Sequence, residues 1–253
     1  MHRFPEAGTG ETDTGDEMTE AGTTDPGLRG AIEAFLTGRG AALVGFADIT
    51  VLAEEVREGL PRAVSFALRL TPSIVAGIKD GPTEEYVQEY TRRNRELDVL
   101  AESLARFLKE KGHRAVPRTS TMEKLPDDLI TPLPQKTVAT RAGLGWIGKC
   151  ALLITPQYGP AVRFNYLLTD APFPTGMPVT ESRCKDCHVC VDICPGKAPS
   201  GKHWKVGMKR EEFFDAQACR KAMDKLADPR GISRHICGLC VANCPHTLKS
   251  LKA

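Results

Sequence analysis

Four cysteines lie within one short stretch, "CKDCHVCVDICP", and their spacing points to metal chemistry. Cys184, Cys187, Cys190 and Cys194 are separated by two, two and three residues, and Pro195 follows directly. Bacterial 4Fe–4S proteins use this spacing, because a loop with two-residue gaps can wrap three corners of a cube. In two-cluster proteins the fourth cysteine of such a run binds the other cluster. The sequence therefore predicts a second set of thiolates.

A second run, "CGLCVANCPH" at 237–246, has three cysteines where the first run has four. Cys219 is the obvious replacement, since Asp215 can cap a helix that carries Cys219 and ends before Pro229. We expect two 4Fe–4S clusters, each completed by a cysteine from the other run. The first set is Cys184, Cys187, Cys190 and Cys244, and the second set is Cys194, Cys219, Cys237 and Cys240.

Other uses of these thiols fit the sequence less well. Structural zinc favours two CxxC pairs over three close cysteines followed by CxxxCP. A disulfide framework needs an oxidising compartment, and nine cysteines is an odd number. Cys150, outside both runs, is interpreted as a small buried hydrophobe, with a ligand or nucleophile role as the alternative. His188 and His246 adjoin the runs and are either cluster neighbours or surface residues.

Helices alternate with short strands between residues 28 and 178, which predicts an α/β or α+β body. Apolar spacing predicts a helix over 28–36 that ends at glycine, and a longer one over 84–111 capped by Thr83. Apolar runs at 41–49, 63–70 and 163–170 are strand candidates. A stretch rich in Pro and Gly, "APFPTGMP", then separates this body from a cysteine-rich module at 179–253.

Composition and charge limit the classes of protein to which this chain can belong. The chain has 253 residues, 26% of them charged, with a net charge of +2. Residues 1–27 hold one Arg against seven Asp and Glu, so we expect a disordered acidic tail, in which Met18 is an alternative start. No apolar run reaches the roughly 18 residues of a membrane span, and no apolar signal region opens the chain. These features predict a cytoplasmic protein without membrane contact.

The sequence around the first cysteine run resembles two enzyme families. "AGLGWIGK" at 142–149 is similar to epoxyqueuosine reductases, and "ITPQYGPAVR" at 154–163 is similar to reductive dehalogenases. The resemblance covers about 135–246 and is closest to compact, stand-alone double-cluster proteins. Both families combine a cobalamin-binding α/β domain, similar to nitroreductases, with a two-cluster ferredoxin module. The resemblance therefore implies this fold and a corrinoid cofactor.

Three glycines and an arginine are the candidate cofactor-binding residues of the body. Gly143, Gly145 and Gly148 permit positive φ or a close backbone approach. This suits either a flat macrocycle or the packing of a strand on a helix. Arg163 would face a bound anion or substrate, or form a surface ion pair. Trp146 is expected in the core.

The chain departs from both families at the expected proton donor. Without gaps, the catalytic acid of the reductases aligns with Leu129, which cannot donate a proton, and Asp128 is one residue away. Tyr86, Tyr90 and Tyr158 match the dehalogenase acid by residue type alone. The reductases also continue past the second CP motif into a tRNA-binding segment, which has no counterpart in these 253 residues. Full epoxyqueuosine reductase activity is therefore not expected.

Two functions of different classes stay open. The first is an oxidoreductase that passes electrons through both clusters to a corrinoid in the body and reduces an unidentified substrate. The presence of the α/β body favours this first function, because an electron carrier needs only the cysteine-rich module. The second is an electron-transfer or activator protein that serves a partner, such as a corrinoid protein, and binds no corrinoid itself. Either would take electrons from a donor such as a ferredoxin or flavodoxin. A nucleic-acid partner is not favoured, because no basic and aromatic array is present.

Anaerobic reconstitution with iron and sulfide tests the cluster count. We expect about eight irons per chain, because two cubes hold four irons each. Cys219→Ser should disrupt one of the two centres in the EPR spectrum of the reduced protein. About four irons in the unchanged protein, or two intact centres in the Cys219 variant, would show that the assignment is wrong.

Overall fold

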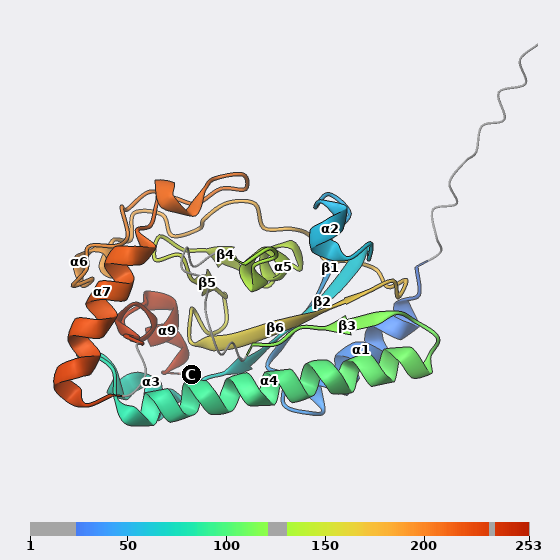
Figure 1. The fold of residues 1–253 in the computed structure, drawn as a ribbon, viewed down its shortest axis with the longest axis horizontal. Helices are drawn as coiled ribbons and strands as arrows, with labels where there is room; N and C mark the ends of the chain where they lie inside the picture. The colour runs from blue at the N-terminus through green and yellow to red at the C-terminus, as the bar shows by residue number, and fades with distance from the viewer. Residues whose placement is uncertain (1–23, 121–130, 233–235, 253) are drawn as a thin grey trace, which may run out of the picture.

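A four-stranded antiparallel sheet in the order β1-β2-β6-β3 forms the centre of the computed structural model, which describes residues 24–120, 131–232 and 236–252 (Figure 1). All three strand pairings are antiparallel. The body therefore takes the α+β form of the mixed class expected from the sequence. The strands are β1 Leu43–Asp48, β2 Arg62–Arg69, β3 Ala115–Pro117 and β6 Val162–Thr169.

Two helices, α1 Pro26–Thr37 and α4 Glu84–Glu110, cover one face of the sheet (Figure 1). Both begin at side-chain caps: Asp25 accepts a hydrogen bond from the backbone of Leu28, and Thr83 accepts one from Tyr86. These caps satisfy amide groups that have no partner inside the helix. The predicted helices at 28–36 and 84–111 are thus confirmed to within two residues at each end. Their apolar stripes meet β1, β2 and β6 in the largest core cluster.

The opposite face of the sheet carries α2 Glu54–Arg57 and α5 Gln135–Arg141. Val138 and Ala139 of α5 pack with buried residues of β1, β2 and β6 in a second core cluster. A narrow ribbon, β4 Trp146–Ile147 paired with β5 Leu153–Ile154, follows α5. Helix α3 Pro72–Gly77 joins β2 to α4. The sheet is therefore enclosed between helices on both sides.

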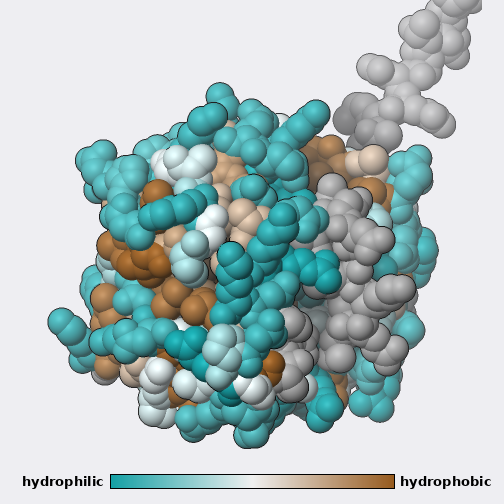
Figure 2. All heavy atoms as spheres, turned by 60° about the vertical axis from the view of Figure 1, so that its left-hand side comes forward, coloured by the Kyte–Doolittle hydropathy of each residue, from teal (hydrophilic) through white to brown (hydrophobic). Residues whose placement is uncertain are grey.

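The cysteine-rich module lies at one end of the sheet, beside α3 and the first turns of α4 (Figure 1). Its helices are α6 Val189–Asp192, α7 Ala216–Ala227, α8 Leu239–Ala242 and α9 Pro245–Ser250, with 3-10 turns η1 Arg210–Glu212 and η2 Asp228–Arg230. The predicted cap of α7 is confirmed, since the Asp215 carboxylate accepts a hydrogen bond from the backbone of Ala218. Figure 2 brings this end forward and shows groups of apolar residues between hydrophilic ones.

The two cysteine runs fold alike. Helix α6 begins one residue before Cys190, and α8 begins one residue before Cys240. The two short helices pack against each other. This pairing brings the runs together although they are separated by more than 40 residues in the sequence.

Two expectations concern residues outside the described ranges. These are the acidic tail, except for its last few residues, and the alignment of Asp128 and Leu129 with the catalytic acid. Among the described helices, none is long and apolar enough to cross a bilayer.

Two substitutions on α4 test how this helix is held. Leu104 is fully buried in the core, whereas the side chain of Val99 on the same helix is 61% exposed. Leu104→Ala should lower the free energy of unfolding by about 2–5 kcal/mol, through lost burial and the cavity left behind. Val99→Ala should change it by no more than about 0.5 kcal/mol. Anaerobic urea unfolding measures both, and equal losses would mean that this stripe does not hold α4 to the sheet.

Candidate functional site

The first expected ligand set comes together from both runs. All eight cysteines of the two sets are half-buried. Burial raises the pKa of the Cys244 thiol to about 11, and the nearby thiols of Cys184 and Cys187 contribute to this shift. A cysteine of the second run therefore lies beside the first run. Metal binding would displace these thiol protons.

Three members of the second expected set, Cys194, Cys219 and Cys237, also lie near one another. Burial raises the pKa of the Cys219 thiol to about 11, with further contributions from Cys194 and Cys237. Cys194 belongs to the first run, so this group also crosses between the runs. In the described part of the chain, no three His, Cys, Asp or Glu side chains converge as they would around a single ion. A cube presents four separate irons, and iron ligation by these thiols stays a prediction.

Cys150 lies between the two thiol groups. It is buried with Trp146 in an apolar cluster, as expected for a small hydrophobe. Its thiol also hydrogen-bonds with those of Cys190 and Cys240, one from each expected ligand set. Sequence reasoning did not foresee this position, because nothing in "GWIGKCALL" indicates where the ribbon meets the module.

Lys149 and Trp146 hold the first run against the ribbon. The Lys149 side chain is almost completely buried, and its Nζ donates hydrogen bonds of 3.0 Å to the carbonyls of Lys185 and Cys187. The Trp146 Nε1 donates to Cys184 Sγ at 3.4 Å. Trp146 is thus a core residue, as expected, and also touches a predicted ligand. Lys149 was not singled out from the sequence, although a lysine inside an apolar stretch was a usable signal.

The three glycines are close to parts of this chain itself. A Cβ added to Gly145 would lie 2.1 Å from the carbonyl oxygen of Ile154, and one on Gly148 would lie 2.7 Å from the Ile154 side chain. Gly143 has a φ of +76° and faces the carbonyl of Met177. These contacts serve the packing of β4 on β5 and on the module. Contact of the glycines with a macrocycle stays a prediction.

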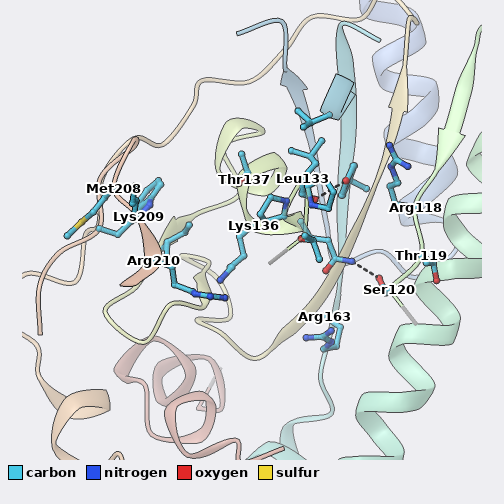
Figure 3. A pocket seen from close by; sticks show the side chains of 18 of the residues that line it. Arg118, Thr119, Ser120, Leu133, Lys136, Thr137, Arg163, Met208, Lys209 and Arg210 are labelled. Carbon is cyan, nitrogen blue, oxygen red and sulfur yellow. Dashed lines mark hydrogen bonds between the residues drawn. The ribbon is translucent and has the colours of Figure 1, made fainter. Parts of the chain in front are cut away.

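A cavity of about 990 Å³ lies between the sheet and the module (Figure 3). The body contributes residues of α2, α4, α5 and β6 and the ends of the described chain at Ser120 and Thr131. The module contributes Trp204 and residues 208–211 and 213, all between Cys194 and Cys219. Its apolar lining consists of Val56, Leu133, Ile147, Trp204, Met208 and Phe213. None of the three glycines is among the described lining residues.

Arg163 lines this cavity. Its Nε donates to Asn94 Oδ1 at 2.9 Å, and its guanidinium lies 4.1 Å from the centre of the Tyr90 ring. The surface ion pair considered for Arg163 does not occur among the described residues. Of the three tyrosines considered as acids, Tyr90 lines the cavity, whereas Tyr158 lies beside Arg69. The third, at position 86, is buried near Gly238 of the module.

The comparisons with known proteins confirm the resemblance seen in the sequence. No family model matches the chain. It is 33% identical over 131 residues to the epoxyqueuosine reductase of Bacillus anthracis, covering 49% of this chain and 34% of the relative. It is 28% identical over 180 residues to the epoxyqueuosine reductase of Salmonella typhimurium, covering 70% of this chain and 45% of the relative. The chain thus spans about a third of the length of the first relative and less than half of the length of the second.

Solved structures share the fold. A catabolic reductive dehalogenase superposes with a TM-score of 0.65 at 19% identity, over 93% of this chain and 35% of the dehalogenase. An epoxyqueuosine reductase in complex with an epoxyqueuosine-modified tRNA-Tyr stem loop gives a TM-score of 0.55 at 21% identity, over 88% of this chain and 66% of that one.

Replacing Lys149 tests how the first run is held. Lys149→Met removes both hydrogen bonds to the loop carbonyls, and buried carbonyls without donors are costly. We expect reconstituted protein to lose iron toward about four per chain, with the cluster of the first set affected. Lys202→Met, an exposed lysine of the same module, is the matched control and should keep the full iron content. Equal iron in both variants would contradict an anchoring role for Lys149.

Proposed function

We propose that this protein is an iron–sulfur reductase whose two clusters pass electrons to a corrinoid in the cavity, where an unidentified substrate is reduced. The observation that carries the proposal is the position of β4. Trp146 and Ile147 are neighbours on this strand, so their side chains point to opposite sides. Trp146 touches Cys184 of the first thiol set, and Ile147 lines the cavity. A single strand therefore separates the predicted electron source from the cavity.

The cavity suits a large cofactor. Its volume of about 990 Å³ is at the upper end of the usual range for ligand sites. Ile147, Trp204 and Phe213 form an apolar wall in contact with one another, which suits the face of a broad ring. Tyr90 of α4 and Arg163 of β6 add polar groups to the lining of the cavity. When bound, a corrinoid supplies a strongly reducing cobalt centre.

The names of the relatives support reduction as the class of reaction. The curated relatives are epoxyqueuosine reductases, and both they and the dehalogenases share this fold. The proposed substrate is not the tRNA of the reductases, because this chain covers less than half of the length of those relatives. A ferredoxin or flavodoxin is the proposed electron donor.

Cobalamin binding tests the proposal. Anaerobic protein with both clusters should bind cobalamin at a ratio of about one to one with a shifted optical spectrum. Thr137 lines the cavity, so Thr137→Trp should weaken this binding by filling space. Thr91 lines a separate groove along α4, and Thr91→Trp is the matched control that should bind as the unchanged protein does.

The outcome separates the two functions considered. Intact clusters without cobalamin binding under reducing conditions would exclude the reductase and leave the electron-transfer or activator function. Binding that is equally weakened by both tryptophan variants would mean that cobalamin does not occupy this cavity.

A further inference from the structure

Two cationic side chains converge on one side of the cavity. Lys136 projects from α5 and Arg210 from η1 of the module, and Figure 3 shows their charged ends pointing toward each other. The two elements are separated by more than 70 residues in sequence, so only the fold brings the charges together. Both residues line the cavity.

Lys136 has little compensation for its charge. Its Nζ donates one hydrogen bond of 2.7 Å to the carbonyl of Ala151, and the described residues give it no ion pair. An ammonium has three protons to donate. Burial lowers the pKa of Lys136 to about 8, and the charge of Arg210 contributes to this shift. The site is therefore unfavourable for a cation unless a negative group joins it.

The charged side chains that line the rest of the cavity are also mostly positive. Its described lining contains five cationic side chains, Arg118, Lys136, Arg163, Lys209 and Arg210, and three carboxylates, Glu55, Glu58 and Glu211. Glu58 pairs with Arg118 at 2.6 Å, and Glu211 pairs with Arg210 at 2.8 Å. Two of the three carboxylates are thus already engaged with arginines, and the positive charge of Lys136 remains.

We propose that Lys136 and Arg210 form an oxyanion subsite of the cavity, which binds a carboxylate or phosphate group carried by a molecule with an apolar body. The apolar body follows from the neighbouring wall of Ile147, Trp204 and Phe213. A guanidinium and an ammonium beside each other can share one oxyanion through charge-assisted hydrogen bonds. The anion relieves the repulsion between the two cations.

This inference deepens the proposed function, and two sources can supply the oxyanion. One is the substrate to be reduced. The other is the phosphodiester in the nucleotide loop of cobalamin. Cobinamide is a corrinoid that lacks this phosphodiester, so the two corrinoids distinguish the sources.

Sulfate binding to the full chain with both clusters and without corrinoid tests the subsite. Sulfate keeps its charge across the neutral and alkaline range, and isothermal titration in chloride buffer measures its affinity. Lys136→Gln and Arg210→Gln should each weaken binding by about tenfold or more, the loss expected for one charge-assisted hydrogen bond. Lys136→Arg keeps the charge and should retain most of the affinity. Lys221→Gln removes an exposed positive charge on α7 and should bind as the unchanged protein does.

The pH dependence gives a second readout. Sulfate affinity should fall as the pH rises through about 8, because Lys136 then loses its proton. The charge of Arg210 and the thiol of Cys150 both act on Lys136, and arginine side chains in general keep their charge over this range. Lys136→Arg should abolish this fall.

Corrinoid titrations of the Lys136→Gln variant identify the source. Weaker binding of cobalamin but not of cobinamide assigns the subsite to the phosphodiester. Unchanged binding of both, with sulfate still binding to corrinoid-loaded protein, assigns it to the substrate. If neither corrinoid binds the unchanged protein, the proposed function fails, while the sulfate titration still decides on the subsite. No sulfate binding to the unchanged protein, or equal affinity in Lys136→Gln, Arg210→Gln and Lys221→Gln, overturns the proposal.

Discussion

The close approach of Gly145 to the carbonyl of Ile154 is the contact on which the arrangement of the site depends. Any side chain at position 145 would overlap that oxygen, so only glycine lets β4 and β5 pair at this point. The pairing orients β4, and β4 in turn sends Trp146 to the cysteines and Ile147 to the cavity. A ribbon of two residues per strand therefore contacts the cysteine-rich module on one side and the cavity on the other.

Backbone strain is found at two points of the same region. Ala151 and Lys185 are non-glycine residues with φ of +58° and +47°, a conformation that costs about 1–3 kcal/mol at each position. In both cases the carbonyl accepts a hydrogen bond from a lysine, Lys136 for Ala151 and Lys149 for Lys185. The strained residues thus turn their carbonyls toward the ammonium groups of two lysines. The free-energy cost of these two backbone conformations is thus linked to the positions of the Lys136 and Lys149 charges.

The parts of the structure that follow from local sequence could be predicted, and those that depend on assembly could not. Apolar periodicity and a capping threonine define α4, and the cap at Asp215 defines α7. Cysteine spacing predicted that the two runs approach each other, which the neighbours of Cys244 and Cys219 bear out, whereas the two complete ligand sets stay a prediction. Strands β4 and β5 are too short to show a period. The cavity is built from segments distant in sequence, so a single lysine on α5 gives no sign that it meets Arg210.

One wall of the cavity belongs to the chain between Cys194 and Cys219, and the thiols of these two cysteines, at the ends of that segment, lie near each other. Its middle can consequently change in length or sequence while the two cysteines remain where they are. Diversification of ligand preference among proteins of this architecture would then be concentrated in this loop. The two cysteine runs and the central sheet would be conserved around it.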